Sequence, residues 1–246
     1  MTNAPSFTIT LIPAFEDNYI YLLHDKSHNI TALVDPGDFE TTNQYLTKHH
    51  LTLTHIFLTH HHSDHIGGVE KLATLYHPKI YGPALNQAQI PQITHPVKEG
   101  DHVTFGDASF MVIETPGHTL GHILFFESAH HILFSGDTLF GIGCGRLFEG
   151  TYEQMFESLQ KIKKLPHDTQ IFCGHEYTLA NGRFALHLDP ANIAVKDRMR
   201  KVTNLRENHQ PSIPFTLAED LATNPFLKAQ SVQDFQKIRQ AKNNFV

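Results

Sequence analysis

The stretch THHHSDHIGG, residues 59–68, decides how this chain is interpreted. It places four histidines and an aspartate within six positions, directly after the apolar run 56–58, as a loop follows a buried strand. In an extended backbone, His60 and His62 project to the same side. Four adjacent ligands can hardly close a tetrahedron around one ion with relaxed backbone angles, so the stretch suits two metal clusters better than one. Its closing glycines are expected to permit a tight turn into a helix.

Three further ligand candidates lie in turn-like settings after predicted strands. They are His118 in ETPGHTLGH, Asp137 in FSGDTLF and His175 in FCGHEY. Each has an ordinary alternative, because a histidine in a turn is usually a surface residue and an aspartate beside glycine often only shapes a turn. Together with residues 59–68, however, they predict a metal site.

The composition limits the classes of protein to which the chain can belong. The chain has 246 residues, 40% of them hydrophobic and 18% charged, which is typical of a soluble globular protein. A net charge of −6 argues against nucleic acid as a partner. No apolar run approaches the roughly 18 residues that span a membrane, and no signal segment opens the chain. With only Cys144 and Cys173, both expected to be packing residues, we predict a cytoplasmic protein, and we expect a monomer.

Periodicity predicts a mixed α/β protein in which helices cover layered sheets. The expected strands are 7–11, 19–24, 30–35, 54–59, 78–82, 102–106 and 109–114, followed by a hairpin of 122–127 and 131–135. The expected helices between them are 41–50, 68–77 and 151–165.

After about residue 173 the strand-like runs stop and helix signals dominate. Asp189 before a proline is typical of an N-cap, and we expect it to open a helix that ends near Asn208. Two further helix starts carry capping pairs, Thr216 with Glu219 and Ser231 with Asp234. We therefore divide the chain into a catalytic domain, 1–173, and a helical substrate-binding domain, 174–246.

The last predicted helix combines an apolar stripe with two cations. At about 100° per residue, Arg239 and Lys242 fall in the same sector as Val232, Phe235 and Ile238. Cations that point inward need an anionic partner, since a buried unpaired charge is unfavourable. Periodicity leaves two alternatives open: the cations bind an anionic ligand, or they extend along the surface and pair with nearby acidic side chains.

These motifs resemble the metallo-β-lactamase superfamily, whose pattern THxHxDH is followed by a later histidine, an aspartate and a last histidine. Within it the chain is most similar to glyoxalase II, the hydroxyacylglutathione hydrolases. The segments that carry this closer resemblance are VDPGD at 34–38, TPGHTLGH at 115–122, SGDTLF at 135–140, GCGRLFEGT at 143–151, CGHEYT at 173–178 and NPFL at 224–227.

The resemblance implies a four-layer αβ/βα sandwich with the metals at one edge of two sheets and a C-terminal helical domain. It implies two divalent ions per chain, with zinc expected and iron or manganese as alternatives. One ion would bind His60, His62 and His118, the other Asp64, His65 and His175, and Asp137 would bridge both. Asp64 and Asp137 would be the catalytic carboxylates, and the neighbouring His61 and His122 would be bystanders.

The implied reaction is hydrolysis of an S-(2-hydroxyacyl)glutathione, S-D-lactoylglutathione above all, to D-lactate and glutathione, the second step of methylglyoxal detoxification. A hydroxide bridging the two metals would attack the thioester. A thiolate of pKa about 8.5 leaves without much help from an acid, which fits the lack of an obvious acid candidate.

The resemblance also favours the anion-binding alternative for the last helix. The family uses an arginine and a lysine at the positions of Arg239 and Lys242 to hold the glycine carboxylate of glutathione. Arg146 and Tyr177 match two further glutathione contacts. Phe148 departs from the family, because relatives often have a tyrosine there, so we predict weaker substrate binding without loss of catalysis.

Four competing functions are weighed against this one. The nearest is a persulfide dioxygenase of the same fold with a single iron, which would retain fewer ligands of the second site. A β-lactamase would require a cysteine ligand near His175 and has no use for the two cations of the last helix. A metal-dependent nuclease would carry a basic surface. A metal-storage or sensing protein would show no thioester turnover.

Overall fold

The computed structural model describes residues 4–245, and its strands form two six-stranded sheets and a two-stranded ribbon. In the first sheet the order follows the chain, β1-β2-β3-β4-β5-β6. The hairpin β1–β2 and strand β3 are antiparallel, and β3 to β6 run parallel. The strands are β1 (Thr8–Ala14), β2 (Asn18–Asp25), β3 (Ile30–Val34), β4 (His55–Phe57), β5 (Lys79–Pro83) and β6 (His95–Val97).

The second sheet has the order β14-β13-β10-β9-β8-β7. Its strands are β7 (His102–Phe105), β8 (Ala108–Glu114), β9 (Ile123–Glu127), β10 (Ile132–Gly136), β13 (Gln170–Cys173) and β14 (Phe215–Thr216). The ribbon pairs β11 (Leu139–Phe140) with β12 (Gly143–Cys144). Each strand predicted from the sequence overlaps an observed one, and the hairpin β9–β10 is confirmed.

Helices follow the same order along the chain. In the first two thirds they are α1 (Phe39–Lys48), α2 (Ser63–Ile66), α3 (Val69–Tyr76), the short 3-10 helix η1 (Ala84–Asn86) and α4 (Tyr152–Lys163). The last third contains α5 (Thr178–Leu188), α6 (Ile193–Glu207), α7 (Leu217–Thr223), α8 (Pro225–Lys228) and α9 (Val232–Asn243). The predicted helices 41–50, 68–77 and 151–165 correspond to α1, α3 and α4.

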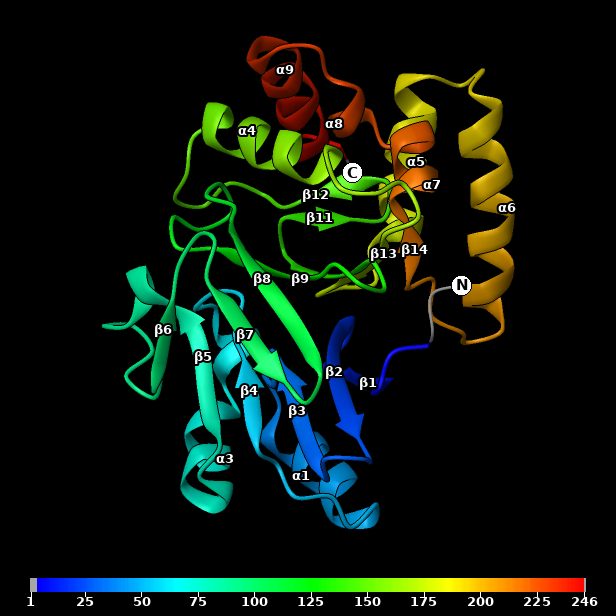
Figure 1. Ribbon diagram of the computed structural model, residues 1–246. Coiled ribbons are helices and arrows are strands. Elements are labelled where there is room, and N and C mark those ends of the chain that lie inside the picture. The colour runs from blue at the N-terminus through cyan, green and yellow to red at the C-terminus, as the bar shows by residue number, and fades with distance from the viewer. Residues whose placement is uncertain (1–3, 246) are drawn as a thin grey trace.

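Strand β2 shows why the molecule has four layers. Its residues are nearly all buried and alternate between two cores. Tyr21 and Leu23 belong to the cluster between the two sheets, whereas Ile20 and Leu22 belong to the cluster between the first sheet and helices α1 and α3. Helix α4 and the C-terminal helices cover the far side of the second sheet, so the layers run αβ/βα (Figure 1). The predicted sandwich is confirmed.

The C-terminal segment is not purely helical, and the expectation that strands end near residue 173 is wrong at one place. Strand β14 lies within this segment and pairs antiparallel with β13. Two residues are too few to show a strand period in sequence. Phe226 and Phe235 belong to the same core cluster as the second sheet, so this segment packs directly onto the first part of the chain. The division at residue 173 remains a prediction.

The expected N-cap at Asp189 is also wrong. Asp189 is the C-cap of α5, and its side chain accepts a hydrogen bond from the Ala191 backbone. The N-cap of the next helix is Asn192, whose side chain accepts from the Val195 backbone N–H. Asp-Pro pairs form turns as readily as they start helices, which explains the error. The predicted capping box of Thr216 with Glu219 is confirmed, and Ser231 is the predicted N-cap, although only its own side chain makes the capping hydrogen bond, with the Asp234 backbone N–H.

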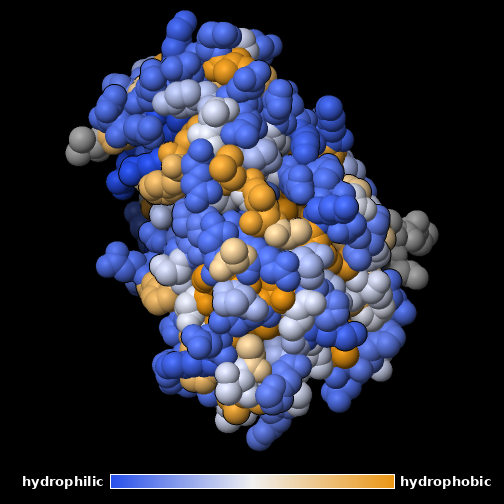
Figure 2. Space-filling view, turned by 90° about the vertical axis from the view of Figure 1, so that its left-hand side faces the viewer, coloured by the Kyte–Doolittle hydropathy of each residue, from blue (hydrophilic) through white to orange (hydrophobic). Residues whose placement is uncertain are grey.

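Most of the apolar mass lies inside these cores. Figure 2 shows one face that is largely hydrophilic, with hydrophobic residues in a discontinuous band. Among the described residues, no helix combines the length and apolar character needed to cross a bilayer. The cytoplasmic location and the monomeric state remain predictions.

Candidate metal centre

The candidate site is built by loops that follow neighbouring strands. Strands β3 and β4 are parallel, so the loop after β3 and residues 59–65 after β4 emerge at the same edge of the first sheet. In the second sheet, β10 and β13 are also parallel, and they end beside Asp137 and His175. An isolated bridge between Asn18 and His175 joins the two sheets at this edge. Segments more than 100 positions apart therefore meet at one point.

Three histidines converge at the first position, as predicted. His60 Nε2 lies 3.1 Å from His62 Nδ1, and His118 Nε2 lies 3.0 Å from the same atom. His60 and His118 are buried and His62 is partly exposed. We call these residues the three-histidine cluster. Three ring nitrogens this close, with no carboxylate among them, form a ligand set typical of zinc and similar ions.

A second group lies beside the first. Asp64 Oδ2 is 3.5 Å from His65 Nε2 and 3.4 Å from His175 Nε2. We call Asp64, His65 and His175 the mixed cluster. Residues 60–65 therefore contribute side chains to both clusters, as expected if the stretch serves two metal ions.

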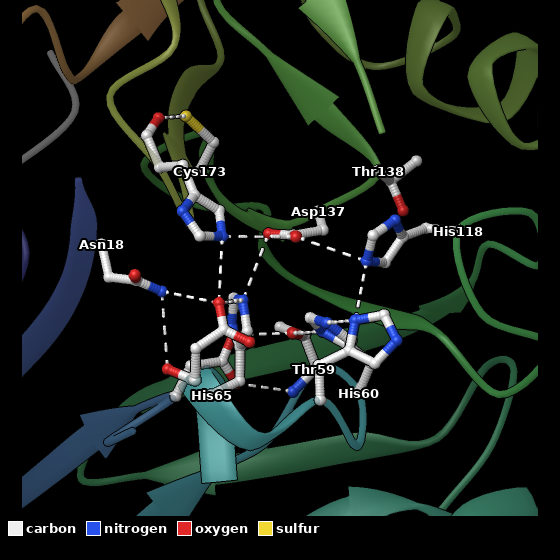
Figure 3. Close-up of polar contacts among 12 residues, drawn as sticks. Asn18, Thr59, His60, His65, His118, Asp137, Thr138 and Cys173 are labelled. Atoms are coloured by element: carbon white, nitrogen blue, oxygen red, sulfur yellow. Dashed lines mark hydrogen bonds and ion pairs between the residues drawn. The ribbon is translucent and has the colours of Figure 1, made fainter. Parts of the chain in front are cut away.

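Asp137 lies between the clusters. Its Oδ2 is 3.4 Å from His118 Nε2 and 3.4 Å from His175 Nε2, while its Oδ1 is 3.4 Å from His65 Nε2. Figure 3 shows the carboxylate with His60 and His118 on one side and His65 on the other. A single carboxylate therefore faces both clusters, as the predicted bridging role requires.

Two buried polar atoms in this centre have no partner. Among the described residues, neither His65 Nε2 nor Asp137 Oδ1 makes a hydrogen bond. A buried polar atom without a partner is unfavourable, and such atoms are rare in folded proteins. The two atoms lie 3.4 Å from each other, and one cation bound by both would satisfy them. The residues present therefore fit a metal ion.

The electrostatics favour a cation in the same place. Burial, followed by the charges of His65 and His122, keeps the pKa of His60 well below its ordinary value, so the ring is in the neutral form that binds metals. Burial also lowers the pKa of His175, but hydrogen bonds to Asp137 and Asp64 outweigh it and raise the pKa to about 10. The carboxylates of Asp137 and Asp64 therefore favour positive charge at this place.

Asp35 orients two of the ligands and was not singled out from the sequence as a functional residue. Its carboxylate accepts hydrogen bonds from the Thr59 backbone at 2.8 Å and the Thr59 hydroxyl at 2.6 Å, and it lies 3.0 Å from His65 Nδ1. Thr59 Oγ1 in turn lies 3.0 Å from His60 Nδ1. Such partners fix ring orientation and increase ligand basicity. The sequence did contain a signal for Asp35, because the segment VDPGD at 34–38 follows a buried strand.

The glycines near this loop are needed for close approach. A Cβ on Gly37 would lie 1.8 Å from the Asp64 backbone oxygen, and one on Gly67 would lie 2.7 Å from the Gly37 oxygen. Gly67 and Gly68 have ordinary right-handed backbone angles. The expected turn is confirmed, because these two residues form the turn that joins α2 to α3. Its angles do not require glycine, and the lack of a side chain instead lets the loop after β3 pack against α2.

Three more contacts support the ligands from the far side. His175 Nδ1 lies 2.8 Å from Asp17 Oδ1, Asp64 Oδ2 accepts from Asn18 Nδ2 at 2.9 Å, and His118 Nδ1 lies 2.7 Å from the Arg146 backbone oxygen. The sequence analysis missed Asp17 and Asn18. Nothing in the turn that contains them marks it as part of a metal centre, because its partners lie far away in sequence.

The two histidines named as bystanders differ from each other. His61 points away from both clusters, toward Asn86 at 3.1 Å and Glu149 at 3.2 Å. His122 is fully buried, and its Nε2 accepts a hydrogen bond from the Asp137 backbone N–H at 3.0 Å. It is absent from both clusters but fixes the backbone of Asp137.

A cavity of about 640 Å³ connects the metal centre with the last helix. Arg239 and Lys242 both line it, together with ligands of both clusters. Arg239 is buried, donates to the Cys144 backbone oxygen at 2.9 Å and lies over the Phe226 ring. Within residues 4–245 neither cation forms an ion pair with an acidic side chain. This geometry favours the interpretation that the two cations bind an anionic ligand. It argues against the alternative in which they extend along the surface and pair with acidic side chains.

The remaining predicted substrate residues line the same cavity. Arg146 is exposed, and the Tyr177 ring stacks on His175 with centroids 4.7 Å apart. Phe148 is 62% exposed and contacts His62 and His118 edge-on. Burial raises the pKa of the Cys144 thiol to about 11, consistent with a packing role rather than a nucleophilic one.

Comparison with known proteins gives two family matches that together span most of the chain. Residues 15–175 match the metallo-beta-lactamase superfamily, and residues 176–245 match the hydroxyacylglutathione hydrolase C-terminus. The chain is similar to the hydroxyacylglutathione hydrolase of Bdellovibrio bacteriovorus, with 46% identity over 96% of this chain and 97% of the relative. That of Vibrio cholerae is 48% identical over 90% and 86%.

Solved structures show the same architecture. ETHE1 from Myxococcus xanthus superposes with a TM-score of 0.71 and 26% identity, over 95% of this chain and 89% of that one. The BLEG-1 B3 metallo-beta-lactamase superposes with a TM-score of 0.68 at 23% identity, over 90% of this chain and 100% of that one.

Proposed function

Because the chain belongs to the hydroxyacylglutathione hydrolases of the metallo-β-lactamase superfamily, and is thus a metal-dependent thioester hydrolase, we propose that it works with two divalent ions. One would bind the three-histidine cluster and the other the mixed cluster, with Asp137 shared. The observation that carries this proposal is the position of Asp137, with Oδ2 at 3.4 Å from a histidine of each cluster.

Zinc is the ion we propose. Imidazole and carboxylate ligands suit zinc, and they also suit iron and manganese, which remain the alternatives. The arrangement supports two ions because the mixed cluster has three ligand atoms in place, and its buried His65 Nε2 makes no hydrogen bond within the described residues.

Two bound ions would lower the pKa of water toward neutrality and stabilise the negative charge that develops on an attacked carbonyl. The chain's own residues supply orientation. Asn18 holds Asp64 by a 2.9 Å hydrogen bond, and His122 holds the backbone of Asp137. A thiolate of pKa about 8.5 leaves without a strong acid, which suits a site built from imidazoles and carboxylates.

The substrate we propose is an S-(2-hydroxyacyl)glutathione, in particular S-D-lactoylglutathione, which would give D-lactate and glutathione in methylglyoxal detoxification. Glutathione has a terminal glycine carboxylate, and the cavity presents Arg239 and Lys242 without an acidic partner among the described residues. Burial and the nearby charges of Arg239 and Arg146 lower the pKa of Lys242, and a bound carboxylate would offset this repulsion.

A paired assay tests this function. The purified protein is incubated with S-D-lactoylglutathione and, separately, with glutathione persulfide, and metal content is measured on the same sample. We expect thioester hydrolysis, two ions per chain, and loss of activity with a chelator that added metal restores. Turnover of the persulfide alone, with one iron per chain, would instead establish the dioxygenase alternative. Metal binding without any turnover would indicate a storage or sensing protein.

Phe148 provides a test of substrate binding. We expect Phe148→Tyr to lower KM by roughly two- to tenfold, the effect of one added hydrogen bond, with little change in kcat. The ring already lines the cavity, so its new hydroxyl would reach the substrate. Phe156→Tyr, which adds the same hydroxyl on α4 away from this cavity, is the control. An unchanged KM in Phe148→Tyr would contradict the prediction.

A further inference from the structure

We propose that the acyl part of the substrate occupies a second cavity beside the metal centre, and that Phe15 and Glu16 at its rim select neutral acyl groups. The inference rests on the proposed thioester hydrolysis and adds a specificity-determining region to it. It concerns residues 15–17, which form the turn that joins β1 to β2.

This second cavity has a volume of about 560 Å³ and adjoins the first, and Lys242 lines the first cavity but not the second. Four residues line both cavities, namely Ser63, Asp64, His175 and Tyr177. These shared residues, which include Asp64 and His175 of the mixed cluster, therefore form the ridge between two adjoining spaces. We call the one that contains Lys242 the glutathione cavity and the other the acyl cavity, which is lined in addition by Phe15, Glu16, Asp17, Asn18, Gly37 and Gly67.

The geometry of a thioester assigns its two ends to these spaces. Sulfur and the acyl substituent leave the carbonyl carbon in different directions. If the glycine carboxylate is held by Arg239 and Lys242, the sulfur approaches the metal centre from the glutathione cavity. The carbonyl must lie at the ridge near Asp64 and His175, and the acyl substituent then extends into the acyl cavity.

Phe15 has an unusual conformation for its size. Its φ is 51°, in the left-handed region that favours glycine, and 60% of the residue is exposed. It stands in the three-residue turn between Ala14 and Asn18, which pair at the ends of β1 and β2. A bulky residue held in this region points to a functional constraint. Its ring gives the acyl cavity an apolar wall that an acyl side chain can contact.

The charges of the two cavities are opposite. The glutathione cavity contains Arg146, Arg239 and Lys242, which outnumber its two carboxylates, Asp64 and Asp137. The acyl cavity contains Glu16 and Asp17 as well as the ligand Asp64, and of the described residues that line it none is a lysine or arginine. An acyl group that carries its own carboxylate would be repelled there, whereas a neutral hydroxyacyl group would not. The cationic cavity would thus bind the anionic glutathione end of the substrate, and the anionic cavity would accept a neutral acyl end.

Three glutathione thioesters test the proposal: S-glycolyl (small), S-mandeloyl (neutral and aromatic) and S-succinyl (anionic). Phe15→Gly suits the left-handed turn and removes the ring, and Phe15→Asn, which also tolerates this conformation, is the second variant. We expect both to lower kcat/KM for the mandeloyl substrate by roughly three- to tenfold relative to the glycolyl substrate, because apolar contact is lost. Thermal unfolding and metal content confirm an intact fold.

Glu16→Gln tests the charge. We expect it to increase kcat/KM for the succinyl substrate by roughly two- to fivefold relative to the glycolyl substrate, the range of an exposed charge pair. Controls are Ile193→Ala and Glu153→Gln, exposed positions outside both cavities. Equal changes for all three substrates, or none, would overturn the acyl cavity while leaving hydrolysis intact. Failure of the unmodified protein to cleave any of the thioesters would instead refute the proposed function.

Discussion

Replacing Asp137 with asparagine is expected to lower kcat/KM for S-D-lactoylglutathione by roughly a thousandfold and to reduce the bound metal to one ion or less per chain. The carboxylate faces a histidine of each cluster at 3.4 Å, and an amide cannot offer two anionic oxygens to two cations. The variant also leaves the positive charge of the mixed cluster less neutralised. Steady-state kinetics and elemental analysis of the same preparation measure both effects.

Asp168→Asn is the matched control, because Asp168 is an exposed aspartate whose ion pair with His131 lies outside the metal centre. It should retain full activity and metal content. Circular dichroism would establish that Asp137→Asn folds. If Asp137→Asn kept two ions and nearly normal turnover, the shared role of this carboxylate would be wrong, whatever the metal.

Lys242→Ala is expected to raise KM by roughly tenfold to a hundredfold with a much smaller change in kcat, because a charge-assisted contact is worth about 1.5 to 3 kcal/mol. The lysine lines the glutathione cavity at a distance from the reacting carbonyl, so its loss affects binding more than chemistry. Lys242 makes no hydrogen bond within the described residues apart from those of its helix, so truncation should leave the fold intact.

Two comparisons make this prediction specific. Lys237→Ala removes a lysine from the opposite, exposed face of α9 and should leave KM unchanged. A substrate whose glycine carboxylate is esterified should bind the unmodified protein weakly. Its affinity for the Lys242→Ala variant should be only slightly lower, because the ester has no carboxylate for the lysine to bind. If the ester and the free acid lost affinity equally, Lys242 would not be the carboxylate partner.

The candidate metal ligands could be singled out from the sequence because metal chemistry constrains residue type and spacing. Four of the seven candidates lie within residues 60–65, and His118, Asp137 and His175 each follow a segment with strand character. Parallel strands carry such loops to one edge of a sheet. The structure places all seven together, and the assignment of each to an ion remains a proposal.

Helix α9 shows where periodicity reaches its limit. The pattern placed Arg239 and Lys242 on the inward face but left their partner open. The structure brings Arg239 to the Cys144 backbone, 95 positions away, and opens a cavity between them and the metal centre. The same limit explains the missed strand β14, since its pairing partner defines it and its two residues show no period.

The sequence by itself predicted layered sheets covered by helices and singled out the seven candidate ligands, because these depend on strand and helix periods and on residue types at short spacings. The four-layer arrangement was implied by the resemblance of its motifs to a known family. Only the tertiary structure revealed the contacts from Asp17, Asn18 and Asp35, and the opposite charges of the two cavities. Those features depend on side chains from distant segments meeting at one point. Residues 59–68 supply four of the candidate ligands, but the orientation of their side chains is set by other loops.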